Sequence, residues 1–261
     1  MSAFSEPSNG AALVTGGAQR MGRAIVLALA RAGYAVAVHA RHSRAEAEAL
    51  CGEIARSGGR AHPVIGDLAD HETVVKLVPA ASAAVGRLTL LVNNANEFTS
   101  DEIGRLDRVI FDRQIAVGLR APLFLAEAFA AQAPEGGVAS VVNLLDQRVY
   151  RQIPRFFSYG LAKSALYAAT GMLAQALAPK VRVNAVAPGP TLPSELQTAA
   201  DFLRQRSAVP LGHGPNPDEI AAAVLYLADA KSVTGETIAV DGGQHLSWQT
   251  ADEAEIAAPV T

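Results

Sequence analysis

The chain has 261 residues, of which 50% are hydrophobic and 18% are charged, and its formal net charge is −3. This much apolar material excludes a disordered chain, and 22 basic against 25 acidic residues give no reason to expect nucleic acid or a membrane as a partner. A single cysteine, Cys51, excludes an internal disulfide, and the N-terminus lacks a signal-peptide pattern. No apolar run reaches the length that spans a bilayer, so we expect a cytoplasmic protein.

Short apolar runs alternate with helical patterns along the chain. Strands are predicted at residues 11–14, 35–39, 64–67, 88–94, 138–145, 181–189 and 236–240. Helices are predicted from the glycine turn to Gly33 and at 44–57, 71–85, 102–133, 157–177, 195–207 and 217–229. Because parallel strands need long crossover connections, usually helices, this alternation indicates parallel pairing. We expect an α/β fold: a single Rossmann-like, doubly wound domain with a seven-stranded parallel sheet.

No internal repeat or low-complexity segment interrupts this pattern. No linker rich in Pro, Gly or Ser is long enough to divide the chain, so one domain is expected to cover residues 10–248. Residues 1–9 are predicted to be a frayed N-terminus, and residues 249–261 a C-terminal tail.

A glycine-rich turn, TGGAQRMG at 15–22, connects the first strand to the first helix. Such a turn lets the backbone approach a pyrophosphate, whose charge then lies at the helix N-terminus. Gly16 and Gly22 are six residues apart, and Arg20 takes the place of the middle glycine. We predict that the turn binds a nucleotide and that Arg20 contacts a phosphate; the alternative is a turn with a structural role only.

The end of the second strand distinguishes NADPH from NADH, because an acidic side chain there binds the ribose of NAD and repels a 2′-phosphate. This chain has no acid at that place and instead has His39, Arg41, His42 and Ser43. The sequence therefore favours NADPH. The alternative is that Arg41 and His42 belong to an ordinary solvated loop.

Tyr159 and Lys163 stand four residues apart at the start of an alanine-rich helix, so their side chains lie on one face. An ammonium group beside a phenol favours the phenolate and lowers the pKa of the phenol from about 10. The pair is therefore a candidate proton donor, and the alternative is an ordinary surface pair at a common spacing.

Five motifs occur in the order and context of the short-chain dehydrogenase/reductase family: TGGAQRMG, NNA at 93–95, YGLAK at 159–163, VNAVAPG at 183–189 and VTGETIAVDGG at 233–243. Together they extend over almost the whole chain, which resembles that family. The resemblance implies an NAD(P)-dependent oxidoreductase that forms dimers or tetramers through its two longest helices.

The resemblance also implies roles for individual residues. Tyr159 would transfer a proton, and Lys163 would lower the pKa of Tyr159 and hold the nicotinamide ribose. Further cofactor contacts implied by the resemblance are Met21, Asp67 at the adenine, Leu68, Asn94 and Ala95 near the ribose, and Pro188 and Gly189 along the nicotinamide.

Two positions depart from the family pattern. Thirteen residues before Tyr159, where the family usually has a serine that hydrogen-bonds a substrate carbonyl, this chain has Asp146. An ionised aspartate only accepts hydrogen bonds, so it repels a developing oxyanion but suits a substrate edge rich in N–H donors, or a proton relay. Gly118 replaces an asparagine that commonly holds a water in the family's relay, which must then use the backbone carbonyl or be lost.

The aspartate resembles one branch of the family, the pteridine reductases and the short-chain dihydromonapterin and dihydrofolate reductases. Other residues that agree with this branch are Arg20, the basic run from His39 to Ser43, and Phe98 after the Asn-Asn-Ala-x turn. The resemblance implies that Phe98 stacks a pterin ring against the nicotinamide and that Asp146 binds its N–H edge. The alternatives are Phe98 as a loop anchor, and Asp146 as a buried acid paired with Arg148 or Arg151.

The leading hypothesis is an NADPH-dependent reductase that transfers hydride to a C=N bond of a pterin or dihydrofolate, with Asp146, Tyr159 and Lys163 delivering the proton. The main alternative is a carbonyl reductase of the 3-oxoacyl carrier-protein type, which needs a hydrogen-bond donor near the substrate oxygen. A third hypothesis is a nucleotide-binding regulator without activity. Metal-ligand spacing of His, Cys or acids does not occur, so we expect no metal.

Other segments are assigned peripheral roles. Residues 190–210 occupy the place of the family's substrate lid, and their amphipathic pattern is suited to closing over a ligand. Trp248 and His245 follow the last strand, where family members often contact a neighbouring subunit. His213, in a turn-rich segment, and Cys51, in a predicted helix, are expected to have no catalytic role.

Overall fold

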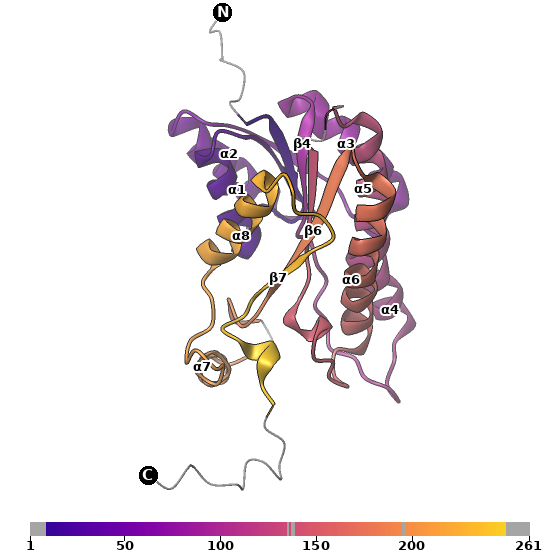
Figure 1. Ribbon diagram of the computed structural model, residues 1–261, viewed down its shortest axis with the longest axis vertical. Helices are drawn as coiled ribbons and strands as arrows, with labels where there is room; N and C mark the ends of the chain where they lie inside the picture. Colours follow the sequence, from indigo (N-terminus) through magenta and orange to yellow (C-terminus); the bar gives the residue numbers. More distant parts are fainter. Residues whose placement is uncertain (1–8, 135, 137–138, 195–196, 249–261) are drawn as a thin grey trace, which may run out of the picture.

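The computed structural model describes residues 9–134, 136, 139–194 and 197–248, so the predicted C-terminal tail and nearly all of the predicted N-terminal segment lie outside the described residues. Seven strands form one parallel sheet in the order β3-β2-β1-β4-β5-β6-β7 (Figure 1). The strands are β1 (Ala11–Val14), β2 (Ala35–Ala40), β3 (Arg60–Ile65), β4 (Leu88–Asn93), β5 (Ala139–Leu144), β6 (Val181–Pro188) and β7 (Thr237–Val240). The α-helices are α1 (Arg20–Arg31), α2 (Arg44–Arg56), α3 (His71–Val85), α4 (Arg108–Ile115), α5 (Ala121–Gln132), α6 (Phe157–Leu177), α7 (Ala199–Ser207) and α8 (Pro217–Asp229).

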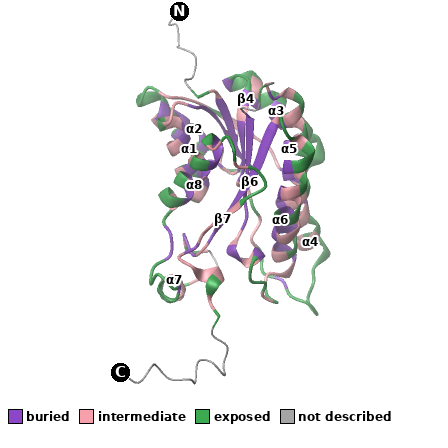
Figure 2. Ribbon diagram, viewed as in Figure 1, coloured by how far each residue is buried: buried purple, intermediate pink, exposed green. Residues whose placement is uncertain are grey.

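The direction in which the sheet is built reverses at β1. The chain first runs outward from β1 to β2 and β3, then returns to β4 on the other side of β1 and continues to β7. Helices α1, α2 and α8 cover one face of the sheet, and α3, α5 and α6 cover the other, so the central strands are buried on both sides (Figures 1 and 2). The predicted doubly wound, seven-stranded parallel sheet is confirmed. In such folds, ligands bind at the carboxyl ends of the strands beside the reversal.

Three predicted elements differ from the structure by more than one residue at an end. β3 begins at Arg60, before the predicted start, because this edge strand is only partly buried and has no continuous apolar run. The predicted helix 102–133 is instead α4, a π-helical turn at Ala116–Arg120, and α5. Helix α4 begins only after Asp107, whose side chain accepts a hydrogen bond from Ile110 N at 3.0 Å. Helix α7 begins at Ala199, and residues 195 and 196 of its predicted range lie outside the described residues.

One helical stretch of the described chain, Arg108–Gln132, is long and apolar enough to cross a membrane by length and composition, and the mean hydropathy of its most apolar 18 residues is 1.3. Half of its most apolar window is buried inside the fold. Helix α5 packs against α3 and β4, and α4 packs against α6. This packing explains the apolar composition, so we assign the stretch to the core of the domain.

Candidate active site

A cleft of about 1470 Å³ extends along the carboxyl ends of the strands, from the turn after β1 to the end of β6. It brings together every residue that the sequence assigns to the cofactor or the substrate. These residues are Gly16, Arg20, Met21, Gly22, His39, Arg41, His42, Ser43, Asp67, Leu68, Asn94, Ala95, Phe98, Asp146, Tyr159, Lys163, Pro188 and Gly189. Their shared location agrees with the predicted site, while the role of each residue stays a prediction.

The glycine turn forms the nucleotide end of this cleft. Gly16 has φ +61°, a left-handed conformation that favours glycine, and a Cβ on Gly22 would lie only 2.1 Å from the carbonyl oxygen of Gly16. Helix α1 begins at this turn, and its N-cap residue Gln19 makes no side-chain capping hydrogen bond. The close backbone approach and the N–H groups at the start of α1 fit a pyrophosphate.

Arg20 adopts a left-handed backbone conformation with φ +53°, which is costly for a residue other than glycine. Its guanidinium Nη2 donates a hydrogen bond to the carbonyl oxygen of Pro193 at 2.6 Å. Arg20, which the sequence predicts to contact a phosphate, therefore lines the cleft, but its guanidinium is hydrogen-bonded to the segment that follows β6. This bond connects the glycine turn to the predicted lid.

His39 supports the glycine turn through a hydrogen bond, and its imidazole is neutral. Its Nδ1 accepts a hydrogen bond from Gly16 N at 3.1 Å, so the ring proton is on Nε2, which lies 3.0 Å from the carbonyl oxygen of Gly66. Burial lowers the pKa of His39 to about 4. The histidine predicted to bind the cofactor therefore acts in this structure as a neutral support of the turn.

Thr15 and Asn94 hold the turn from the side of β4. The Asn94 amide donates to the carbonyl oxygens of Thr15 at 2.8 Å and Gly16 at 3.0 Å. The Thr15 hydroxyl accepts from Asn94 N at 2.9 Å and from Ala95 N at 3.0 Å. The sequence prediction omitted Thr15, although its place directly before the glycine pair is a signal for this role.

The catalytic end of the cleft contains a hydrogen-bonded group around Asp146. The Tyr159 hydroxyl donates to Asp146 Oδ2 at 2.9 Å, and the same oxygen accepts from Arg148 Nη1 at 2.9 Å. Asp146 Oδ1 accepts from the Arg148 backbone N at 2.8 Å. Asp146 is therefore both an acid paired with Arg148 and the direct partner of Tyr159. Arg151 instead donates to the carbonyl oxygen of Ser247.

The expectation that Lys163 lowers the pKa of Tyr159 is wrong for this structure. Burial and then the charge of Asp146 raise the pKa of Tyr159 well above its usual value, and Arg148 offsets only part of this. Lys163 Nζ lies 5.9 Å from the centre of the Tyr159 ring and donates to the carbonyl oxygen of Leu144 at 2.6 Å. Burial lowers the pKa of Lys163 itself to about 8.

Phe98 lies beside this group in a small aromatic cluster. Its ring stacks on Phe156 with centroids 4.5 Å apart, and it meets the Tyr159 ring edge-on at 4.9 Å. The Arg148 guanidinium lies 5.8 Å from the centre of the Phe98 ring and 5.4 Å from that of Phe156. Phe98 thus lines the cleft, as the pterin hypothesis requires. Its ring contacts also fit the alternative, in which Phe98 only anchors its loop.

Helix α6 carries Tyr159, and a distant aspartate fixes its start. Its N-cap residue, Phe156, has φ +56° and no polar side chain. The buried Asp101 takes over the capping role, because its carboxylate accepts from Ser158 N at 3.0 Å and from the Ser158 hydroxyl. Asp101 thereby joins the loop of Phe98 to the helix of Tyr159. Sequence reasoning missed it, since it lies 57 residues from Ser158.

Gly118 lies in the π-helical turn, with α6 packed against it. A Cβ at this position would lie 3.1 Å from the Cβ of Ala162. The glycine therefore permits close packing beside the catalytic helix, and it offers no side chain to a proton relay.

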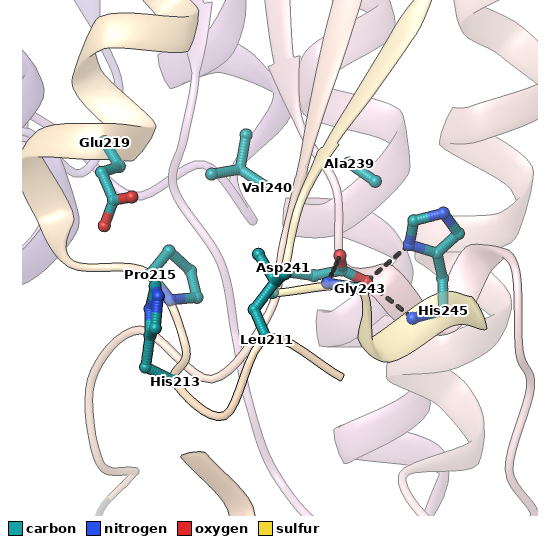
Figure 3. A pocket seen from close by; sticks show the side chains of 10 residues that line it. Leu211, His213, Pro215, Glu219, Ala239, Val240, Asp241, Gly243 and His245 are labelled. Atoms are coloured by element: carbon teal, nitrogen blue, oxygen red, sulfur yellow. Dashed lines mark hydrogen bonds and ion pairs between the residues drawn. The ribbon is translucent and has the colours of Figure 1, made fainter. Parts of the chain in front are cut away.

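The predicted lid and the peripheral residues lie as follows. Cleft-lining residues of the 190–210 segment are Pro190, Thr191, Leu192, Ser194, Gln197, Asp201, Gln205, Ala208 and Val209. His213 and His245 instead line a separate cavity of about 270 Å³, where His245 Nδ1 lies 2.8 Å from Asp241 Oδ2 (Figure 3). Trp248 is exposed, and burial raises the pKa of the Cys51 thiol to about 11, as suits a passive thiol.

Comparisons with known proteins identify the family of the chain. A family model described as "Enoyl-(Acyl carrier protein) reductase" matches residues 16–245. An uncharacterized oxidoreductase of Mycobacterium tuberculosis is 38% identical over 89% of this chain and 90% of its own length. The 3-oxoacyl-[acyl-carrier-protein] reductase FabG of Staphylococcus aureus is 30% identical over 90% of this chain and 98% of its own.

Among solved structures, FolM alternative dihydrofolate reductase 1 from Brucella suis, in complex with NADP, is 50% identical. It superimposes with a TM-score of 0.91 and covers 94% of this chain and 98% of its own. The chain therefore belongs to the short-chain dehydrogenase/reductase family, which confirms the resemblance seen in the sequence.

Proposed function

We propose that the chain is an NADPH-dependent reductase that transfers hydride to a C=N bond of a pterin or dihydrofolate. The observation that carries this proposal is the bond between Asp146 and Tyr159, 2.9 Å long, beside Phe98 in the cleft. A carboxylate accepts hydrogen bonds from the N–H edge of an aminopterin, and an aromatic ring stacks on its flat face. The same carboxylate disfavours a substrate that develops an oxyanion at this place.

NADPH, when bound, supplies the hydride. The turn of Gly16 and Gly22 is suited to the pyrophosphate, and Arg41, His42 and Ser43 line the cleft where the 2′-phosphate would lie. The FolM structure from Brucella suis, which is 50% identical, was solved with NADP, and this supports the choice of cofactor. Lys163 is the proposed contact to the nicotinamide ribose.

Reduction of a C=N bond adds hydride to the carbon and a proton to the nitrogen. In this structure the Tyr159 proton points to Asp146, so a substrate N–H that binds Asp146 competes with the tyrosine for the same oxygen. That competition frees the hydroxyl to donate its proton to the substrate nitrogen. The positive charge of Arg148 then offsets the repulsion between the new phenolate and Asp146.

A second candidate is a carbonyl reductase of the 3-oxoacyl carrier-protein type. The description of the matching family model and the 30% identity to FabG favour it. It requires a hydrogen-bond donor near the substrate oxygen, and Asp146, already paired with Arg148, does not provide one.

The substitution Asp146→Ser separates the two candidates. With NADPH and dihydrobiopterin, dihydromonapterin or dihydrofolate, we expect kcat/KM to fall about 100-fold, because the acceptor of the N–H edge is lost. With an acetoacetyl thioester, we expect no loss or a gain. The control is Asp112→Ser, an exposed acid on α4 that pairs with Arg108.

The outcomes divide the hypotheses clearly. Native protein that oxidises NADPH no faster with these pterins and folates than without them contradicts the proposal. Turnover of the thioester alone supports the carbonyl reductase. Tight NADPH binding without turnover of either class supports the third hypothesis, a nucleotide-binding regulator.

We also propose that the protein is cytoplasmic and forms a homodimer or homotetramer, of which the family resemblance implies the oligomer. Apolar side chains that are exposed on the two longest helical segments support a subunit interface there. They are Phe124 on α5 and Leu161, Tyr167 and Met172 on α6.

A further inference from the structure

Four charged side chains of alternating sign form a continuous chain along the wall of the cleft. Glu97 Oε1 accepts hydrogen bonds from Arg41 Nη1 and, at 2.7 Å, from Arg113 Nε. Arg113 extends its other two nitrogens to the carboxylate of Asp67, with N–O distances of 3.1 Å. All four residues line the cleft, and they come from the ends of β2 and β3, the loop after β4, and helix α4.

Glu97 is the central member of this charge chain. Its side chain is 20% exposed, less than Arg113 at 32% and Arg41 at 37%, and among the ion pairs of the described residues it alone joins both arginines. Arg113 also donates two hydrogen bonds to the Asp67 carboxylate, and these bonds do not depend on Glu97. Neutralising Glu97 therefore releases Arg41 while Arg113 stays anchored.

Arg41 is also the residue placed to receive a 2′-phosphate, since it directly follows β2 and no acid stands there. An arginine paired with a carboxylate must leave it, or share its donors, to bind a phosphate. The phosphate is a dianion near neutral pH, so the nearby charge of Glu97 also repels it. NADH has a free ribose hydroxyl at this place and requires neither change.

We propose that Glu97 determines how strongly the chain discriminates NADPH from NADH, by holding Arg41 in an ion pair that the 2′-phosphate must replace. This inference rests on the proposed use of NADPH. Arg41 favours NADPH by binding the 2′-phosphate, and Glu97 opposes this by holding Arg41 in the ion pair. Glu97 weakens NADPH binding selectively and leaves NADH binding unaffected.

The test is the dissociation constant of each reduced cofactor, measured by titration of nicotinamide fluorescence on Glu97→Gln protein. We expect NADPH to bind about three- to fivefold more tightly and NADH to bind as in the native protein, because partly exposed ion pairs are worth modest free energies. Adenosine 2′,5′-bisphosphate, compared with adenosine 5′-monophosphate, is expected to show the same gain in competition with NADPH, which makes the result independent of turnover.

The matched control is Glu102→Gln. Glu102 lies in the same loop between β4 and α4, is exposed, pairs only with Arg105 among the described ion pairs, and does not line the cleft. A second variant, Glu97→Ser, removes the charge with a smaller side chain, and thermal unfolding shows that each variant is folded. Glu102→Gln is expected to change neither dissociation constant.

The inference is overturned if both Glu97 variants bind NADPH no more tightly than the native protein does, or if NADH gains equally. A different result would contradict the proposal that the protein uses NADPH. Native protein that binds NADH as tightly as NADPH contradicts the use of NADPH itself, whereas a native preference for NADPH without an effect of Glu97 contradicts only this inference.

Discussion

The glycine turn at the nucleotide end of the cleft is shaped by backbone and neutral supports, whereas the catalytic end is shaped by charged and aromatic side chains. At the first end, the glycine turn has room for no side chain at Gly22, and the neutral His39 holds it. At the second end, Asp146, Arg148 and Tyr159 share hydrogen bonds. Shape requirements are common to a family, while side-chain chemistry varies within it. Both ends carry motifs of the family, and the proposal for the substrate rests on the catalytic end alone.

The largest effect should come from the catalytic end. Tyr159→Phe keeps the ring beside Phe98 and removes the proposed proton donor, so kcat is expected to fall about 10²- to 10⁴-fold. The dissociation constant of NADPH should stay unchanged, because the nucleotide end is intact. Steady-state rates and fluorescence titration measure the two quantities. Tyr226→Phe, at an exposed position on α8, serves as the control.

A kcat within about tenfold of native would show that another group supplies the proton. A parallel loss of NADPH affinity would show that the two ends of the cleft are not separable in this way.

At the nucleotide end, Gly22→Ala tests whether shape is the constraint. The new Cβ would lie 2.1 Å from Gly16 O, so we expect the free energy of unfolding to fall by about 1 to 3 kcal/mol and NADPH affinity to fall about tenfold. Gly52→Ala is the matched control, since Gly52 is in α2 and a methyl group added there would have no neighbouring atom within 4 Å. That change should raise stability by about 0.5 to 1 kcal/mol.

Urea unfolding with and without NADPH measures both variants. If Gly22→Ala keeps native stability and affinity, the turn has more freedom than its geometry indicates.

The sequence predicts local features of this molecule better than features that join distant segments. Helix α6 has its predicted bounds, and the seven strands occur in order, because apolar periodicity and glycine turns are local signals. β3 was predicted to start too late because its first residues, RAHP, form no continuous apolar run, unlike those of β7. The fold class was therefore accessible from the sequence, and the start of β3 was not.

The site shows the same division. Every predicted site residue lines the cleft, but Glu97 and Arg113, which also line it, were not predicted. The raised pKa of Tyr159 was not predicted, because it depends on burial and on how Asp146 is placed by the tertiary fold. The bond between Glu97 and Arg41 joins residues 56 positions apart and has no signature in either segment. Contacts of this kind decide electrostatics, and only the structure reveals them.

The last predicted effect concerns the support of the glycine turn by neutral His39. Its folded pKa of about 4 lies below the value of an unfolded histidine, about 6.5, so between these values the unfolded chain binds a proton that the folded chain does not. The stability that depends on neutral His39 is therefore complete above about pH 6.5 and declines as the pH falls toward 4. Between pH 7 and pH 5 the expected loss is about 2 kcal/mol.

Urea unfolding at these two pH values tests this contribution. In His39→Gln protein, which can still accept and donate hydrogen bonds, the difference between pH 7 and pH 5 should shrink by about 2 kcal/mol. His62→Gln, at an exposed position on β3, should keep the native difference because His39 is intact. An unchanged difference in His39→Gln would mean that the imidazole takes up a proton without disturbing the turn. The nucleotide end would then tolerate a charge in the support of its turn, and the contrast with the charged catalytic end would no longer hold.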